Sequence, residues 1–174
     1  LHVKYNSAIY DFYFPGCRLA EHTLKIIHYP TDLYKSPNNV IQREGTAYCI
    51  RKGKGKKLIH DVSNSILIDG KSHAEVAKIF SKVEYFISYD ALTAYSRFAA
   101  LSGCVSVVIP DEGVSIEQWY PNEEDRWGIA YGLSDQAIAL ARKTSHLVSQ
   151  RIEQEEKKCQ EGITKFLKNV DNYF

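Results

Sequence analysis

Short apolar runs alternate with amphipathic segments along most of this chain. Runs rich in β-branched and aromatic residues occupy residues 46–50, 66–68, 85–87 and 105–109, and a further strand is expected to begin near Trp127. Apolar runs of this length without alternating polar positions are typical of strands buried on both faces of a parallel sheet. Residues 58–60 form one more short strand candidate.

Helical signals lie between these runs. Ser72 is a predicted N-cap with Glu75 as its capping-box partner, and apolar residues then recur at helical spacing, at Val76, Ile79, Phe80 and Val83. Residues 93–102 are rich in alanine and end at Gly103, a common residue just past a helix C-terminus. Ser134 is expected to cap a long helix that includes Leu147, and residues 163–170 predict a last amphipathic helix.

This alternation predicts an α/β fold, doubly wound, with a mostly parallel, Rossmann-like sheet flanked by helices and a long C-terminal helical segment. Residues 46–174 would form this domain. Residues 1–45 are Tyr-rich and irregular, with turn signals at Pro15-Gly16 and at Pro37-Asn38-Asn39, and are expected to form an interdomain connection.

Composition narrows the possible functions. The 22 basic and 21 acidic residues nearly cancel, which argues against a nucleic-acid-coating surface. No apolar run approaches the roughly 20 residues that span a bilayer, so no transmembrane segment is expected. The chain is predicted to be cytoplasmic, with a position at the inner face of the membrane left open.

The four cysteines, Cys17, Cys49, Cys104 and Cys159, are widely spaced, which favours reduced structural thiols over a zinc site or a disulfide set. The histidines, His60 among them, have no triad partners in the sequence and are expected to be structural or surface residues. Because the chain contains no Met and begins at Leu1, we expect it to be part of a longer protein.

The strongest candidate site is the turn of residues 88–93. It follows a predicted strand and precedes a predicted helix, the position where open α/β sheets bind ligands and above all phosphates. Its candidate residues are Ser88, Tyr89, Asp90 and Thr93. Arg51 and Lys52 follow another strand and would add positive charge. The alternatives are a solvated basic turn at residues 51–57 and simple helix capping by Asp90 and Thr93.

A family resemblance rests on the order of these features. A strand ending in Arg51-Lys52-Gly53, a Ser-capped helix, a strand ending in Tyr89-Asp90, then Thr93, Ala99-Ala100-Leu101-x-Gly103-Cys104 and a Val-rich strand follow one another. Over roughly residues 45–170 this order resembles the C-terminal, donor-binding half of a GT-B glycosyltransferase of the polysaccharide-biosynthesis type.

The resemblance implies particular roles for these residues. Arg51, Lys52 and Thr93 would meet the diphosphate of a nucleotide sugar. Many retaining members carry Glu-Ala where this chain has Phe98 followed by Ala99, so Asp90 is the nearest acidic residue for the ribose contact.

Two further acidic residues, Asp111 and Glu112, follow the next strand at the same edge of the sheet. They are candidates for contacts to sugar hydroxyls, and a loop chosen for solubility is the alternative.

The predicted function is therefore the donor-binding half of a glycosyltransferase that moves a sugar from a nucleotide sugar to a polysaccharide or glycan acceptor. Its partners would be a nucleotide sugar or nucleoside diphosphate and a missing N-terminal domain of the same chain.

The basic residues would stabilise the departing diphosphate, so no metal or other cofactor is expected. The catalytic residues are not identified, and this chain alone is expected to be inactive. A noncatalytic Rossmann-like binding module and a nucleotide-sugar epimerase-type domain remain alternatives.

Overall fold

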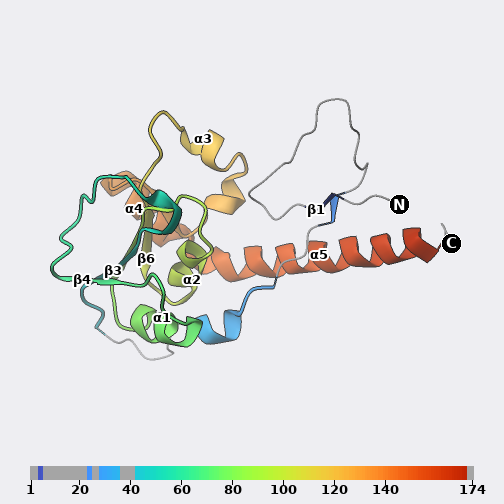
Figure 1. Cartoon of the computed structure of the whole chain (residues 1–174), viewed down its shortest axis with the longest axis horizontal. Coiled ribbons are helices and arrows are strands. Elements are labelled where there is room, and N and C mark those ends of the chain that lie inside the picture. The colour runs from blue at the N-terminus through green and yellow to red at the C-terminus, as the bar shows by residue number, and fades with distance from the viewer. Residues whose placement is uncertain (1–3, 6–22, 25–27, 36–41, 172–174) are drawn as a thin grey trace. The chain divides into compact units, whose positions relative to one another are not determined.

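The computed structural model describes residues 4–5, 23–24, 28–35 and 42–171 (Figure 1). The turn signals at Pro15 and Pro37, and Cys17, lie outside the described residues. The chain divides into two compact units, Pro30–Ser149 and a second unit that combines Leu1–Tyr29 with Gln150–Phe174.

The first unit contains a five-stranded sheet, which confirms the predicted α/β fold. Every pair of neighbouring strands is parallel, and the order across the sheet is β4-β3-β5-β6-β7. The chain moves outward from β3 to β4 and then returns past β3 to β5. The strand order therefore reverses at β3 and β5, which makes this pair the topological switch point of the sheet. The strands are β3 (Thr46–Cys49), β4 (Ser65–Leu67), β5 (Tyr85–Ser88), β6 (Val105–Val108) and β7 (Ile129–Tyr131).

One face of the sheet is covered by α1 (His73–Phe80), α2 (Tyr95–Leu101) and the 3-10 turn η1 (Thr31–Tyr34). The Phe80 ring of α1 lies 4.9 Å from the Phe86 ring of β5. Tyr34 is fully buried, and its ring stacks on Phe98 of α2 at 4.4 Å. The predicted capping box at the start of α1 is present, because the Ser72 hydroxyl accepts the N–H of Glu75 and the Glu75 carboxylate accepts the N–H of Ser72.

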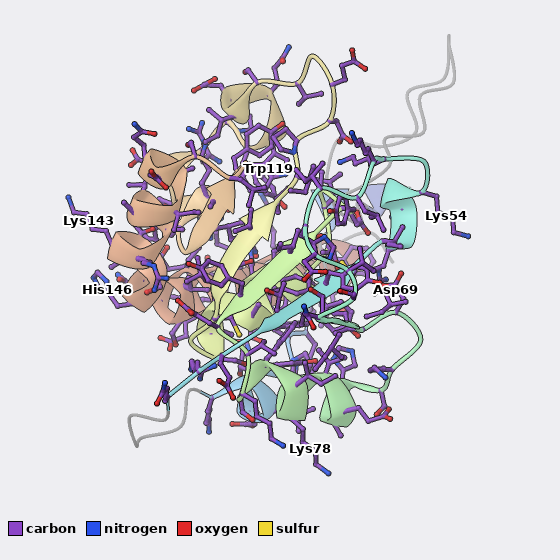
Figure 2. The ribbon with its side chains drawn as sticks, turned by 90° about the vertical axis from the view of Figure 1, so that its left-hand side faces the viewer. Lys54, Asp69, Lys78, Trp119, Lys143 and His146 are labelled. Atoms are coloured by element: carbon purple, nitrogen blue, oxygen red, sulfur yellow. The ribbon has the colours of Figure 1, made fainter. Side chains whose placement is uncertain are left out.

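The opposite face is covered by α4 (Asp135–Thr144). Ala137, Ile138 and Ala141 of this helix pack against a cluster that includes Val107 and Ala130 of the sheet. In Figure 2 the sheet lies between α1, which carries Lys78, and α4, which carries Lys143. Helices on both faces make the sheet doubly wound.

No α-helix links β3 to β4. The connection begins with the 3-10 turn η2 (Arg51–Gly53) and continues as a loop to β4. The prediction of a strand at residues 58–60 was wrong. These residues lie in the loop, where the Ile59 N–H donates to the Tyr89 hydroxyl at 2.8 Å and not to a neighbouring strand. The His60 ring lies 4.6 Å from the Tyr48 ring, which belongs to the cluster under α4. This loop therefore covers part of the sheet that a crossover helix would otherwise cover.

The connection from β6 to β7 contains α3 (Ile116–Trp119) and the 3-10 turn η3 (Glu123–Arg126). Trp119 is buried, stacks on Tyr131 with ring centroids 4.7 Å apart, and donates its indole N–H to the carbonyl of Ala91. Trp119 thus anchors this connection to the strand and to the turn after β5.

The helical segment from Ser134 is not one continuous helix. Ser134 caps α4 as predicted, but α4 ends at Thr144 and is followed by the 3-10 turn η4 (Ser145–Leu147) and by α5 (Val148–Asp171). The Thr144 hydroxyl accepts the N–H of Gly128 at 2.9 Å, which fixes the end of α4 beside the start of β7. Among the described residues, no helix combines the length and the apolar character needed to cross a bilayer.

The second unit pairs β1 (Lys4–Tyr5) with β2 (Thr23–Leu24) in parallel. Within it the Tyr29 hydroxyl donates to Glu155 at 2.9 Å, and the Arg151 guanidinium donates to the same carboxylate at 3.1 Å.

Three cysteines, Cys49, Cys104 and Cys159, are buried and free, as expected. Burial raises the pKa of the Cys49 thiol to about 11 and that of Cys104 to about 12. Thiols with such values stay protonated at neutral pH and are poor nucleophiles.

Candidate ligand-binding site

Three loops meet at the carboxyl edge of the sheet. They follow β3, β5 and β6. The last residues of these strands are register partners, because Cys49 pairs with Ser88 and Ser88 pairs with Val108. The loop after β3 contains the basic run 51–57, the turn after β5 contains Asp90, and the loop after β6 contains Asp111. The sequence prediction that these segments share one edge is therefore confirmed.

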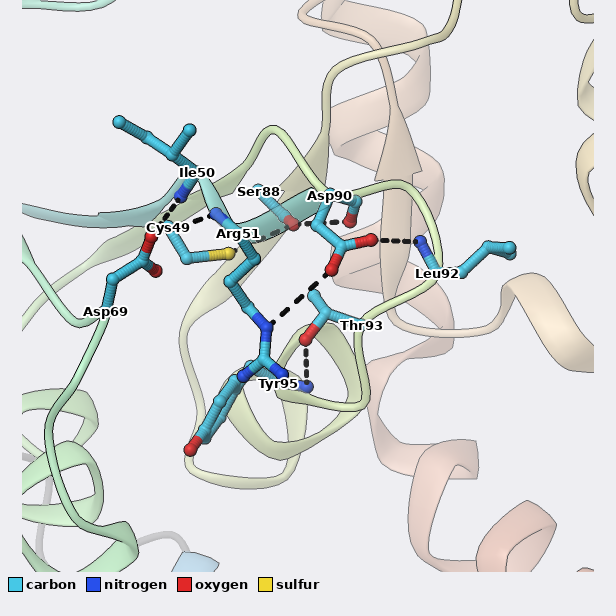
Figure 3. Close-up of polar contacts among 9 residues, drawn as sticks. All are labelled: Cys49, Ile50, Arg51, Asp69, Ser88, Asp90, Leu92, Thr93 and Tyr95. Carbon is cyan, nitrogen blue, oxygen red and sulfur yellow. Dashed lines mark hydrogen bonds and ion pairs between the residues drawn. The ribbon is translucent and has the colours of Figure 1, made fainter. Parts of the chain in front are cut away.

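Arg51 is the second residue after β3, and its side chain reaches toward Asp90 in the turn after β5 (Figure 3). Its Nε is 3.7 Å from Oδ2 of Asp90, and its guanidinium lies 5.3 Å from the centre of the Tyr95 ring. The Arg51 side chain is 45% exposed, whereas that of Asp90 is 6% exposed. A partly exposed guanidinium with a buried counter-ion thus stands at the switch point between β3 and β5.

Asp90 turns inward, toward the protein. Its Oδ1 accepts the N–H of Leu92 at 3.2 Å, and its carbonyl accepts the hydroxyl of Ser88 at 2.6 Å. Ser88 and Tyr89 are fully buried. These three residues therefore shape the turn and hold Arg51, and their side chains offer little surface to a ligand.

Thr93 lies just before α2. Its Oγ1 accepts the N–H of Tyr95 at 3.3 Å, and its carbonyl accepts the N–H of Ser96 at 3.4 Å. The N-cap residue of α2 is Ala94, which makes no side-chain cap bond. The helix expected from residue 93 therefore begins at Tyr95, and Thr93 caps it from one position further out.

Asp69, which is not among the predicted site residues, contacts the backbone of the same loop. It follows β4, and its Oδ2 accepts the N–H groups of Ile50 at 3.2 Å and of Arg51 at 2.9 Å. Its Oδ1 is buried and has no hydrogen-bond partner within the described part of the chain. A signal was present in the sequence, because Asp69 comes just after the expected strand of residues 66–68, and the carboxyl ends of parallel strands lie at one edge of a sheet.

The basic run is anchored at both ends. Nζ of Lys56 donates to the carbonyl of Ile109 at 2.8 Å and lies 2.7 Å from Oδ1 of Asp111. Asp111 is thus paired with Lys56. The side chains of Lys52 and Glu112 are exposed. Since Arg51 and Lys56 are bound to the edge of the sheet, residues 51–57 are not simply a solvated turn.

Close backbone packing holds this loop against β5. A Cβ atom added to Gly53 would lie 2.1 Å from the carbonyl oxygen of Tyr89, so only glycine fits there. The Tyr89 hydroxyl lies 2.7 Å from Nδ1 of His60. Burial lowers the pKa of His60 and so favours the neutral ring. His60 therefore acts as a structural residue of the loop, as expected.

Within the described residues, no group of three or more His, Cys, Asp or Glu side chains is arranged to hold a metal ion. Comparison of the chain with family models, with curated proteins and with solved structures finds no match.

Proposed function

We propose that this chain binds the diphosphate group of a nucleotide sugar at the carboxyl edge of β3 and β5, as the donor-binding half of a glycosyltransferase acting on a polysaccharide or glycan acceptor. The observation that carries the proposal is the position of Arg51. It presents a partly exposed guanidinium at the switch point, where open α/β sheets bind their ligands.

The chemistry of a guanidinium suits a diphosphate. The 3.7 Å between Arg51 Nε and Asp90 Oδ2 exceeds the roughly 2.7–2.9 Å of a charge-assisted hydrogen bond, so Asp90 orients the guanidinium without closing it off. Phosphate oxygens could then accept paired N–H groups of Arg51, with the exposed Lys52 adding a second positive charge. This charge would stabilise the diphosphate as the glycosidic bond breaks.

Binding tests this proposal directly. Calorimetric titration of the purified chain with UDP, GDP and their sugar conjugates should give a measurable Kd for at least one of them. Arg51→Ala should weaken that Kd by about tenfold to a hundredfold, since a charged hydrogen bond contributes about 1.5–3 kcal/mol. Lys78→Ala removes an exposed positive charge from α1 and is the matched control, with no expected change. Equal affinities for Arg51→Ala and Lys78→Ala would refute the proposal.

The donor half needs a partner domain to transfer sugar. We therefore expect the purified chain to bind donor but to show no repeated transfer to an acceptor. Multiple turnovers would mean that the catalytic residues lie within this chain. A cytoplasmic location accords with the free thiols of Cys49, Cys104 and Cys159, because such thiols persist in reducing compartments.

A noncatalytic interaction module is the second candidate. The N–H groups of Leu92, Tyr95 and Ser96 are all bonded within the turn after β5, so this turn is stable without a ligand. This candidate predicts that no nucleotide raises the melting temperature. A ligand that binds only the native state must raise it, so a thermal-shift series separates the two candidates.

A further inference from the structure

We propose that Asp69 is a positioning residue for the candidate site: its carboxylate holds the backbone of Arg51 in the conformation that directs the guanidinium toward a bound phosphate. This role rests on the proposed function, because phosphate binding by Arg51 is its premise.

The backbone of Arg51 is in an unfavourable conformation. Its φ of 42° makes it the one non-glycine residue with positive φ within the described chain. A non-glycine residue in the left-handed region persists only where surrounding contacts stabilise it. Asp69 supplies two such contacts, since one oxygen accepts the N–H of Ile50 and the N–H of Arg51 itself.

These two N–H groups follow the last paired residue of β3, Cys49. The Asp69 carboxylate, which follows β4, thus accepts hydrogen bonds from N–H groups beyond the end of the β3 pairing. It does so where the backbone changes direction. The N–H of Gly53 then donates to the carbonyl of Ile50 at 2.7 Å and closes η2. Asp69 and this short turn together fix the direction of the Arg51 Cα–Cβ bond.

The direction of that bond decides what the guanidinium meets. In the observed conformation it lies beside the Asp90 carboxylate and the Tyr95 ring (Figure 3). Without Asp69, Arg51 would relax toward negative φ, and its side chain would leave from a different direction. Asp69 therefore acts through Arg51 and need not touch the ligand.

The test compares Asp69→Ala and Asp69→Asn in the wild type and in the Arg51→Ala background, with calorimetric Kd values for the nucleoside diphosphate that binds the wild type. Asp69→Ala should weaken binding about tenfold, as when one charged hydrogen bond to a ligand is misplaced. Asp69→Asn keeps an acceptor oxygen and should restore much of the affinity. If Asp69→Ala does not fold, Asp69→Asn is the variant that is compared in the two backgrounds. Asp61→Ala is the matched control, because Asp61 accepts bonds from Ser63 and Asn64 in the same connection, and it should leave Kd unchanged.

The decisive comparison is the double variant. If Asp69 acts through Arg51, replacing Asp69 should have no further effect on Kd once Arg51 is alanine. An equal loss in both backgrounds, or wild-type affinity for Asp69→Ala, would overturn the positioning role and leave the proposed function standing. A wild-type chain that binds no nucleoside diphosphate would overturn both.

Discussion

Replacing Gly53 by alanine should destabilise the fold and the candidate site together. The added Cβ would lie 2.1 Å from the carbonyl oxygen and 2.4 Å from the carbonyl carbon of Tyr89, whereas ordinary contact begins at 3.4 Å. The loop must therefore move away from β5 by more than 1 Å. These two atoms belong to the backbone, and the third atom within 3 Å, Cβ of Tyr89 at 2.9 Å, is bonded directly to it, so no side-chain rotation can make room.

The magnitude follows from what that movement disturbs. Overpacking of a well-packed site typically costs about 1–3 kcal/mol, and a backbone obstacle places Gly53→Ala at the upper end. The bond from the Ile59 N–H to the Tyr89 hydroxyl would be strained as well, at about 1 kcal/mol. A loss of about 3–4 kcal/mol corresponds to a fall in melting temperature of roughly 10 °C for a chain of this size.

Thermal and urea unfolding followed by circular dichroism measure this effect. Gly162→Ala is the matched control. Gly162 lies within α5, its φ is not in the left-handed region, and a Cβ there meets nothing within 4 Å, so alanine should stabilise the helix by about 0.5–1 kcal/mol. If Gly53→Ala unfolds at the wild-type temperature and urea concentration, the loop does not pack against β5 at contact distance.

Three further results are expected. Arg43→Ala should lower the free energy of unfolding by about 3 kcal/mol, because the Arg43 guanidinium donates to the carbonyls of Phe80 and Ser102 at the ends of α1 and α2. In urea titrations Arg43→Lys should recover part of that loss, and a wild-type unfolding midpoint for Arg43→Ala would contradict this prediction. Cys49 and Cys104 should resist a thiol reagent at pH 8 until the chain is unfolded, since burial raises the pKa of Cys49 to about 11 and that of Cys104 to about 12. Rapid labelling of either cysteine in the native chain, mapped by peptide mass spectrometry, would refute this prediction. Burial also lowers the pKa of His60 below its ordinary 6.5, so the unfolded chain binds more protons than the folded chain, and the free energy of unfolding should fall as the pH drops from 7 to 5. His60→Asn should make the free energy of unfolding depend less on pH, and an unchanged pH dependence would mean that other groups cause it.

Signals that are local in sequence predicted much of the fold. Ser72 and Glu75 are three positions apart and form their capping box within one turn, so a short stretch of sequence contains the whole interaction. Gly103 ends α2 with a φ of 90°, which glycine adopts at little cost. Arg51 and Asp90 were predicted to share an edge because each follows a strand of a parallel sheet, and the carboxyl ends of such strands lie on one side.

The features that were missed depend on distant partners. The segment 58–60 became a loop because Ile59 bonds to Tyr89, a residue thirty positions away. Asp111 is paired with Lys56, which no local pattern around either residue indicates. The contact between the Asp69 carboxylate and the Arg51 N–H depends on the pairing of β3 with β4, which places the ends of these two strands side by side. Such contacts follow from the assembled sheet and could not be obtained from short sequence windows.

The parallel arrangement of the sheet also has a kinetic consequence. Thr46 of β3 pairs with Tyr85 of β5, so about forty residues must close into a loop before these strands can meet. Parallel neighbours cannot form as hairpins, and contacts this distant in sequence slow folding. Arg51 and Asp90 come together in the same step that pairs β3 with β5. A ligand held there should therefore bind only chains that have completed their central sheet, and during refolding binding capacity should return no faster than β3 and β5 pair.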